Sequence, residues 1–282
     1  MPLELPVPIL EQVSDALLAR YAALIYDRTG IRVSPQKKTL LSNRLRRRLR
    51  ATAIDGFDDY YRHLKSLPAQ HAEWDAFLQE ITTHETFLFR DEGQWEWFRA
   101  ACLPQIAARE KGSLTRPSLR IWSAACSTGD EAYTAACCIA ATLPDLPRWS
   151  VQILGTDIGL GAVEAARAGL FDQRQMRLVP ESYRGRFFTR SGESWQARPV
   201  LSQMVSFRQH NLLAPLGERP FDVVFLKNVL IYFDRASKER VMANVEPMLR
   251  PGGMLVAGAA EGVSDLVRGL RRCESWLFRR PE

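Results

Sequence analysis

Apolar residues recur every three or four positions through the first part of the chain, which is the spacing of one helix face. The pattern predicts a helix that ends at Thr29-Gly30, a second helix at about 35–50 and a third at about 74–81. No strand-like alternation interrupts these segments. The sequence therefore predicts a small all-helical domain at residues 1–82.

The pattern changes after residue 93, where short apolar runs alternate with helical stretches. The strand-like runs lie at 119–123, 151–157, 205–209, 221–226 and 254–257. Strands that alternate with helices are typical of a parallel sheet covered on both faces. We therefore expect an α/β fold: a Rossmann-like, mostly parallel-sheet domain at 93–282, joined to the helical domain by a linker at 83–92.

Composition narrows the class of protein. Of 282 residues, 46% are hydrophobic, and 38 Lys and Arg against 32 Asp and Glu give a net charge of +6. A folded protein is expected. The positive charge favours an acidic partner, which nucleic acid, an acidic protein helix or a membrane surface could equally provide. The five cysteines are odd in number and lack CxxC spacing, and the four histidines form no ligand set, so we expect a reducing cytosol, no disulfide and no metal. Residues 1–11 do not resemble a signal peptide, and no apolar run is long enough to span a membrane.

Three polar segments follow the predicted strands, where parallel sheets bind ligands. The first, 123–131, begins with Ser123 and contains one glycine, Gly129, so it is not the GxGxxG pyrophosphate fingerprint. Small residues there suit close approach to a ligand without phosphates, such as S-adenosylmethionine. An ordinary tight turn is the alternative.

Asp157 ends the second strand, and Asn228 and Tyr232 follow the most apolar one. A carboxylate at the position of Asp157 can accept hydrogen bonds from both ribose hydroxyls. Its alternative role is to cap the helix that follows. Tyr232 could likewise be an amphipathic cap on the core, although loops on rigid strand ends are where function concentrates.

Taken together, these segments resemble the CheR family of chemotaxis-receptor methyltransferases, from about residue 12 to the end. The matching segments are 83–91 (THETFLFRD), 121–131 (IWSAACSTGDE), 211–213 (NLL), 228–234 (NVLIYFD) and 249–253 (LRPGG). Departures from the family pattern are His84 for Asn, Leu88 for Phe, Asp130 for Glu, Ala132 for Pro and Lys227 for Arg.

The resemblance implies a methyltransferase domain with a small inserted β subdomain, at about 174–204. It also implies transfer of a methyl group from S-adenosylmethionine, with S-adenosylhomocysteine as product, to glutamate side chains of chemoreceptors. The expected cofactor-binding residues are Thr86, Arg90, Ser123, Gly129, Glu131, Asp157, Asn211, Leu212, Asn228 and Tyr232.

The expected reaction is a direct displacement on a methyl group. A glutamate nucleophile is already ionised at neutral pH, so no general base is needed. We expect Arg90 and Tyr232 to line the methyl-transfer site, with Arg90 placing the incoming carboxylate. The alternative for Arg90 is an inter-domain salt bridge.

The second predicted helix has a dense run of positive charge. We predict that it binds the glutamate-rich helices of the receptor through Lys37, Arg44, Arg47, Arg48 and Arg50. The alternative is a solvated face. Residues 37–50 contain no aromatic side chain for base stacking, so nucleic acid is not expected.

Some functional alternatives stay open in the sequence. The segment 190–198 is short for the loop by which some relatives bind a receptor's C-terminal pentapeptide, so we predict no such tether. An RNA or small-molecule methyltransferase, or a non-catalytic S-adenosylmethionine sensor, would share the same loops. A sensor would be expected to have lost Arg90 or Tyr232, and both are present.

Overall fold

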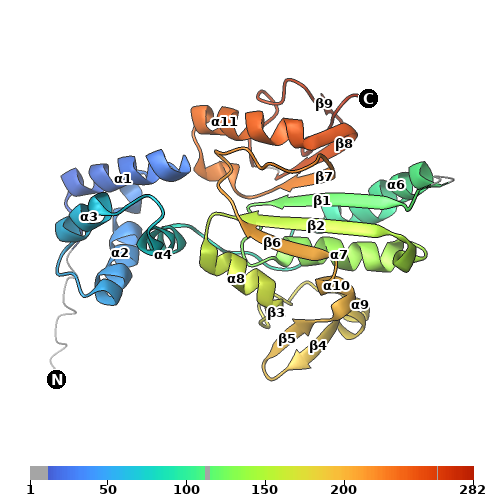
Figure 1. The fold of residues 1–282 in the computed structure, drawn as a ribbon, viewed down its shortest axis with the longest axis horizontal. Helices are drawn as coiled ribbons and strands as arrows, with labels where there is room; N and C mark the ends of the chain where they lie inside the picture. The colour runs from blue at the N-terminus through green and yellow to red at the C-terminus, as the bar shows by residue number, and fades with distance from the viewer. Residues whose placement is uncertain (1–11, 112–114, 259) are drawn as a thin grey trace, which may run out of the picture. The chain divides into compact units, whose positions relative to one another are not determined.

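The computed structural model describes residues 12–111, 115–258 and 260–282. The chain divides into two compact units, Met1–Thr83 and His84–Glu282. Figure 1 shows a helical unit and a unit built on a sheet. The prediction for residues 1–11 lies outside the described residues. In the described part of the chain, no helix is long and apolar enough to cross a membrane.

Within residues 12–83, the first unit packs four α-helices around an aromatic core. They are α1 (Asp15–Thr29), α2 (Lys38–Thr52, preceded by the 3-10 turn Pro35–Lys37), α3 (Phe57–Ser66) and α4 (Ala72–Ile81). Tyr21, Tyr60 and Phe77 are fully buried, and the Tyr21 hydroxyl donates to the Phe57 carbonyl at 2.7 Å. Helix α3 was not predicted, although its buried residues Phe57, Tyr60 and Leu64 have helical spacing.

The second unit begins with a helical stretch and continues as alternating strands and helices. Its helical stretch is α5 (Glu92–Trp97), a π-helical turn (Phe98–Cys102) and α6 (Leu103–Glu110). Its other helices are α7 (Asp130–Thr142), α8 (Leu160–Ala168), α9 (Glu181–Phe187), α10 (Pro199–Ser202) and α11 (Arg235–Val245). Short 3-10 turns lie at Leu146–Arg148, Leu230–Tyr232 and Glu246–Met248.

The strands form two sheets. The large sheet has the order β6-β2-β1-β7-β8-β10-β9 and the small one the order β3-β5-β4. The large sheet is made of β1 (Ser118–Ala124), β2 (Ser150–Asp157), β6 (Val205–Gln209), β7 (Phe221–Leu226), β8 (Leu249–Ala257), β9 (Arg271–Arg272) and β10 (Leu277–Arg279). The first five of its strands in spatial order are parallel, and β10 and β9 are antiparallel. The predicted mostly parallel α/β fold is confirmed.

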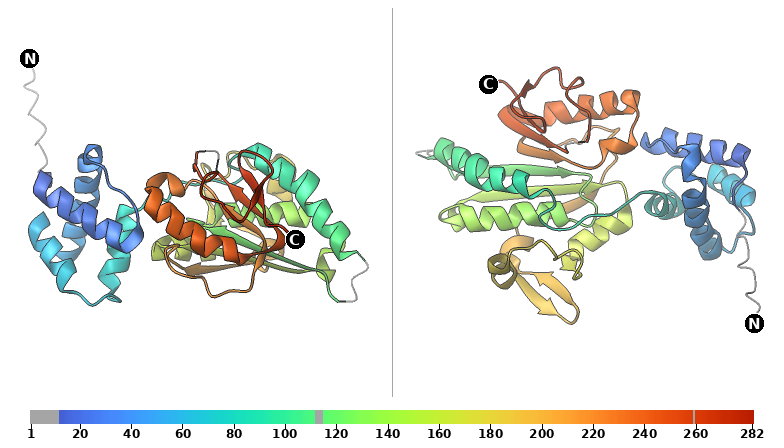
Figure 2. Two further views of the ribbon diagram at one scale, coloured as in Figure 1. Left: turned by 90° about the horizontal axis from the view of Figure 1, so that it is seen from above. Right: turned by 180° about the vertical axis from the view of Figure 1, so that it is seen from behind.

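Alternate residues along the strands build two cores, one on each face of the sheet. On one face, Leu119 and Ile121 join a cluster with residues of α5, α6 and α7. On the other, Trp122 and Ala124 join a cluster with Val241 and its neighbours on α11. The helices α6 and α7 lie across the sheet in the right-hand view of Figure 2. Both faces are therefore covered, as the apolar strands require.

The small sheet is the inserted β subdomain. It consists of β3 (Leu170–Phe171), β4 (Phe188–Ser191) and β5 (Ser194–Ala197), and it lies between α8 and β6 in the chain. Its first strand begins at Leu170, a few residues before the predicted start at 174, because Leu170 and Phe171 pair with Gln196 and Trp195.

Candidate functional site

The register of the large sheet brings the predicted ligand loops together. Ala124 at the end of β1 pairs with Leu226 of β7 on one side and with Thr156 of β2 on the other. Asp157 then pairs with Gln209 of β6. The strand order reverses between β1 and β7, which is where open α/β sheets bind ligands. Neighbouring strands are about 4.8 Å apart, so the four strand ends form a row of about 15 Å.

The loop after β1 has a tightly folded backbone. Ala125, Ser127 and Gly129 all have positive φ angles, of 61°, 51° and 88°. A Cβ atom on Gly129 would come within 2.9 Å of the Ala166 Cβ and 3.1 Å of the Phe207 ring. The close approach that requires glycine is therefore to α8 and β6. A contact between Gly129 and the cofactor stays a prediction.

Asp157 is a buried carboxylate that organises this loop. Its Oδ2 accepts from the Ser127 N–H at 2.8 Å and its Oδ1 from the Gly159 N–H at 2.9 Å. His84 Nδ1 lies 3.7 Å from Oδ1. The N-cap residue of α8 is Gly159, and not Asp157 as the alternative prediction had it. The Asp157 carboxylate instead accepts from the N–H of that cap residue. An ionised carboxylate has about four lone-pair sites, so two remain for other donors.

Glu131 is the second carboxylate at these strand ends. Ser123 Oγ donates to its Oε1 at 2.7 Å, and Lys227 Nζ lies 3.9 Å from its Oε2. Burial raises the pKa of Glu131, and the nearby Lys227 charge opposes that shift. Ser123 is fully buried, and its hydroxyl orients the carboxylate of Glu131.

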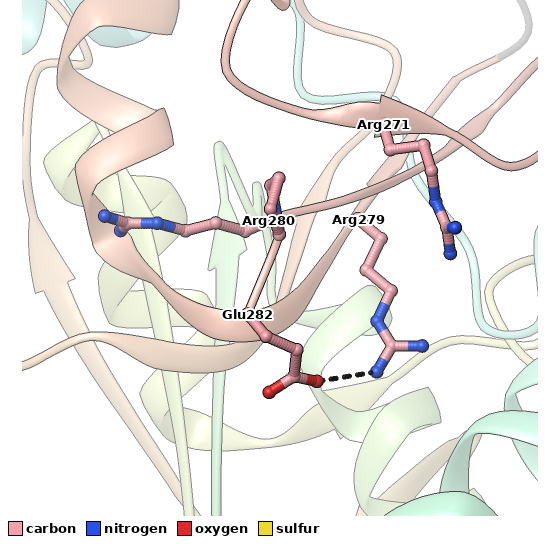
Figure 3. A pocket seen from close by; sticks show the side chains of 5 residues that line it. Arg271, Arg279, Arg280 and Glu282 are labelled. Atoms are coloured by element: carbon pink, nitrogen blue, oxygen red, sulfur yellow. Dashed lines mark hydrogen bonds and ion pairs between the residues drawn. The ribbon is translucent and has the colours of Figure 1, made fainter.

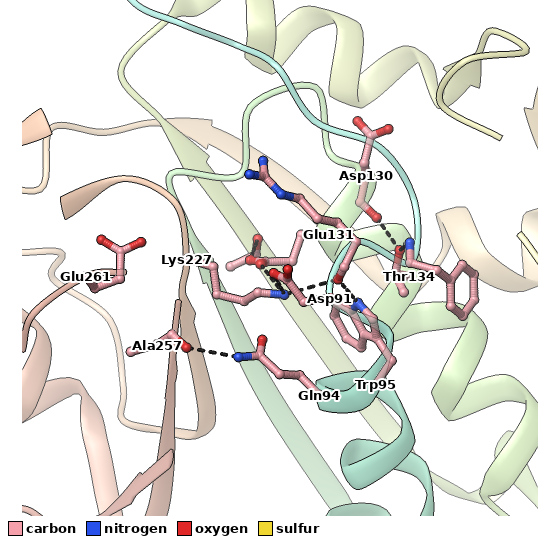
Figure 4. Close-up of polar contacts among 12 residues, drawn as sticks. Asp91, Gln94, Trp95, Asp130, Glu131, Thr134, Lys227, Ala257 and Glu261 are labelled. Carbon is pink, nitrogen blue, oxygen red and sulfur yellow. Dashed lines mark hydrogen bonds and ion pairs between the residues drawn. The ribbon is translucent and has the colours of Figure 1, made fainter. Parts of the chain in front are cut away.

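Lys227 is a buried charge centre that sequence reasoning missed as a site residue. Its ammonium pairs with Asp91 at 3.2 Å, donates to the Arg90 carbonyl at 3.4 Å and lies 5.0 Å from the centre of the Trp95 ring. Figure 4 shows Lys227 reaching from the end of β7 toward Asp91 and Glu131. A charged residue directly after an apolar strand was the signal available in the sequence.

The segment 84–91 belongs to the second unit, and hydrogen bonds made by its backbone groups hold it there. The Ser127 hydroxyl donates to the His84 carbonyl at 3.1 Å. The Leu88 N–H donates to the Gln175 carbonyl at 3.1 Å, and the Phe89 N–H donates to Thr134 Oγ1 at 3.0 Å. Thr86 and Arg90 are thereby held beside the β1 loop.

Arg90 has one side-chain hydrogen bond among the described residues, from its Nη1 to the Glu85 carbonyl at 3.3 Å. No carboxylate described in this unit forms an ion pair with it. Its guanidinium carbon lies 5.7 Å from the centre of the Phe87 ring. Local contacts therefore leave most of its donors available for a ligand.

The loop after β7 is held by a residue that the sequence analysis missed. Asn228 has a φ of 58°, and Tyr232 ends the following 3-10 turn in a half-buried position. Glu261, fully buried, accepts from the Val229 N–H at 3.1 Å. Burial raises the pKa of Glu261, and the backbone N–H groups of residues 228–231 oppose that shift. An acid just beyond the fifth strand could have been found by the same strand-end rule.

Asn211 and Leu212 follow β6 at the other end of the row. Asn211 Oδ1 accepts from the Leu213 N–H at 3.0 Å, and Leu212 is buried. The Leu212 carbonyl accepts from Asn244 Nδ2 at 2.9 Å. The structure thus brings the predicted segments of the second unit to one edge of the sheet.

The basic residues of α2 lie in the first unit and differ in their surroundings. Arg48 is largely buried and donates two hydrogen bonds to Glu73 of α4, at 2.6 and 3.0 Å. Arg44 donates to the Ile81 carbonyl and to Thr83. Lys37, Arg47 and Arg50 are exposed. Arg44 and Arg48 therefore hold α2 against the end of the helical unit, which the charge pattern alone did not indicate.

The donor set suits S-adenosylmethionine better than a phosphate ligand. Apart from Arg90 and from Lys227, whose charge is paired with Asp91, the strand ends are lined by carboxylates, an asparagine and backbone groups. Carboxylates accept from hydroxyls and cations and repel phosphates. The described residues contain no cluster of His, Cys, Asp or Glu that could hold a metal ion. All five cysteines are free thiols.

A separate hollow lies at the β9–β10 edge and shares no residue with these loops (Figure 3). Two of its three arginines already have partners: Arg279 pairs with Glu282 at 3.2 Å, and Arg280 donates to the Pro247 carbonyl at 3.4 Å. It does not have the chemistry of a methyl-transfer site.

Comparison with known proteins identifies the family of this chain. The family model described as "CheR methyltransferase, SAM binding domain" matches residues 84–276, and that described as "CheR methyltransferase, all-alpha domain" matches residues 16–82. The chain is 36% identical to the chemotaxis protein methyltransferase of Salmonella typhimurium over 91% of this chain and 87% of the relative. It is 35% identical to the protein of the same name in Escherichia coli, with the same coverage.

Some solved structures also match this chain, at lower sequence identity than the relatives named above. One is the N-methyltransferase NodS from Bradyrhizobium japonicum, 17% identical, covering 68% of this chain and all of that one with a TM-score of 0.38. The family-model matches cover the sheet unit and the helical unit in turn. The chain belongs to the CheR family of chemotaxis protein methyltransferases, and it carries an S-adenosylmethionine-binding domain that serves methylation in chemotaxis.

Proposed function

We propose that this enzyme works in the cytoplasm and esterifies glutamate side chains on the cytoplasmic helices of chemoreceptors. The observation that carries the proposal is the row of strand ends where Asp157, Glu131 and Arg90 converge. Family membership supports the cofactor and the pathway. S-adenosylmethionine supplies an electrophilic methyl group when bound.

Asp157 and Glu131 are the residues we assign to the cofactor's polar groups. The free lone pairs of Asp157 would accept from ribose hydroxyls, and Glu131 would face a cationic part of the ligand. Thr86, Asn211, Leu212 and Asn228 line the same row and would complete the contacts. Gly129 and Ser123 support the shape of the loop.

Arg90 and Tyr232 are the residues we assign to the methyl acceptor. The acceptor carboxylate is already ionised, so the site has to position it and exclude water from it. Holding reactants in line can lower a barrier by roughly 7–11 kcal/mol. Arg90 should bind the carboxylate only loosely in the ground state, because uniform binding does not accelerate the step.

The outer face of α2 is our candidate for receptor docking. Lys37, Arg47 and Arg50 are exposed there. Leu40, which lies between Lys37 and Arg47 in the sequence, is 45% exposed. Such a face suits an acidic helix, whose attraction to these exposed charges salt screens beyond about 10 Å at 0.1 M. Arg47 also pairs with Glu80 at 2.5 Å, a solvent-exposed contact of small worth.

The docking proposal is tested by reversing Arg47 and Arg50 to Glu. Methylation of receptor should then fall at low salt and approach wild type at high salt, with unchanged S-adenosylmethionine affinity. The control is a matched double reversal of the exposed Lys65 and Arg219, which lie off α2. Normal receptor methylation at low salt by the α2 variant would return these residues to a solvated face. Arg48 is avoided because its loss would leave the largely buried Glu73 carboxylate without its ion-pair partner and destabilise the unit.

The rival activities are less well supported. Chemotaxis relatives at 35–36% identity favour a receptor substrate over RNA or a small molecule, and Arg90 and Tyr232 favour catalysis over sensing. We further propose that the enzyme works without a pentapeptide tether, because the turn between β4 and β5 contains only Gly192 and Glu193. Deleting a receptor's C-terminal pentapeptide should leave its methylation unchanged.

The product distinguishes these activities most clearly. Labelled S-adenosylmethionine, the enzyme and chemoreceptor-bearing membranes from the same organism should yield protein label that mild base releases as methanol. A methyl ester is base-labile, whereas a methylated amine or nucleotide base is not. Base-stable label, or label only in RNA, would contradict the proposal.

A further inference from the structure

Two arginines share one aromatic ring beside the proposed methyl-transfer site. The guanidinium carbon of Arg177 lies 3.4 Å from the centre of the Phe87 ring, and that of Arg90 lies 5.7 Å from it. The two carbons are therefore at most about 9 Å apart. Arg177 comes from the turn that precedes α9, and neither the strand-end loops nor the family motifs include it.

The turn that carries Arg177 is rigidly fixed. Its Gln175 carbonyl accepts from the Leu88 N–H, and the Gln175 side chain donates to Asp130 Oδ1 at 3.0 Å. Met176 and Val179, on either side of Arg177, are buried. The exposed Arg177 side chain thus comes from a turn that is hydrogen-bonded both to the segment 84–91 and to the start of α7.

The local charges are unbalanced. Arg174 pairs with Glu85, whereas Arg177 donates only to the Arg174 carbonyl, at 3.0 Å, and forms no ion pair with a described carboxylate. Two guanidinium groups no more than about 9 Å apart repel each other, and an anion bound near them relieves that repulsion. Leu178, which is 49% exposed, adds an apolar surface to the same turn.

We infer that Arg177 recognises a second carboxylate of the protein substrate, one helical turn from the glutamate that is methylated. This inference rests on the proposed function. Side chains three or four residues apart on a helix have Cβ atoms about 5–6 Å apart. With Arg90 on the acceptor, a carboxylate one turn away falls within reach of Arg177, since both side chains are long and the guanidinium forms paired hydrogen bonds with carboxylates. Arg177 is thus a specificity residue for acidic helices.

The test pairs an enzyme variant with a substrate variant. The enzymes are wild type, Arg177→Ala and, as a matched charge control, Arg219→Ala, which removes an exposed arginine ahead of β7. The substrates are the cytoplasmic fragment of a chemoreceptor from the same organism and a version in which the glutamates three and four residues from the methylated one are Gln. Receptor kcat/KM, S-adenosylmethionine Kd and thermal stability are measured for each enzyme.

Arg177→Ala should lower kcat/KM for the unmodified fragment about tenfold, the loss of one charge-assisted contact. It should leave cofactor affinity unchanged and show no further loss on the Gln-substituted fragment, because the pair is then already broken. The Arg219→Ala enzyme should match wild type. Equal losses on both fragments, or none on either, would overturn the inference. A wild-type enzyme that labels no receptor fragment would instead overturn the proposed substrate, and the inference with it.

Discussion

The two ends of the large sheet use buried carboxylates in opposite ways. At the amino end, Asp222 is held by Arg109 at 2.8 Å, by Arg250 at 2.6 Å and by the Arg120 N–H at 2.8 Å. At the carboxyl end, Asp157 is held mainly by two backbone N–H groups. The amino end satisfies its charge within the chain, whereas the carboxyl end retains acceptor capacity.

A structural charge and a functional charge can therefore be told apart in one fold by the partners that each already has. Removing one partner of a buried pair strands the other charges and costs stability. Removing a carboxylate with uncommitted lone pairs should cost binding instead. Arg48 and Arg177 make the same contrast among the arginines, because Arg48 is paired inside its unit and Arg177 is not.

The largest expected effect is on stability at the amino end. Asp222→Ala removes the acceptor of three donors, two of them arginines that are partly exposed. We expect the free energy of unfolding to fall by about 3 kcal/mol. Chemical denaturation measures it. A variant as stable as wild type would mean that solvent already satisfies Arg109 and Arg250, and would remove this side of the comparison.

The next effect concerns Asp130, the buried first residue of α7. Burial raises its pKa from an ordinary 3.8 to about 6, while bonds from Thr128 and Gln175 oppose that shift. Because the folded state holds this proton more tightly, its contribution to stability is complete below pH 4 and is lost as pH rises toward and past 6. Two pH units correspond to about 3 kcal/mol as an upper value.

Asp130→Asn tests that pH dependence directly. The variant cannot ionise, so its stability should gain on wild type steadily between pH 4 and pH 7. Denaturation at several pH values for both proteins checks this, and taking the difference removes the contribution of other titrating groups. A difference that does not change with pH would show that Asp130 titrates normally.

A smaller effect is expected at Glu261, which acts through the loop it holds. Glu261→Gln keeps the shape but weakens acceptance from the N–H groups of residues 228–231. We expect kcat to fall about tenfold, since the loop carries Asn228 and Tyr232, with a loss in stability of about 1 kcal/mol. Glu261→Asp should restore neither, because its carboxylate is too short to reach the turn. Unchanged kcat in the Gln variant would make Glu261 purely structural.

Much of the fold could be predicted because it depends on local patterns. The apolar strands at 151–157 and 221–226 lie within a residue of their predicted bounds. The strands β9 and β10 were missed, because 271–272 and 277–279 are too short to show a period and form only by pairing with each other and β8.

The site was predictable where it depends on strand ends and not where it depends on distant contacts. Asp157 ends β2 and Asn228 lies two residues after β7, so their meeting at one edge follows from the parallel order. The bond from Gln175 to Asp130 and the burial of Arg48 against Glu73 join residues 45 and 25 positions apart. No periodicity in the sequence reports such pairs.

We propose that S-adenosylmethionine binds at the carboxyl end of the sheet and not at the amino end. Titration calorimetry of Asp157→Asn and Asp222→Asn, each confirmed as folded, tests it most directly. Loss of hydrogen bonds to a charged acceptor, roughly 1.5–3 kcal/mol each, should raise the Kd of Asp157→Asn tenfold or more. Asp222→Asn should bind as wild type does. An unchanged Kd for Asp157→Asn, or equal losses in both variants, would contradict the account.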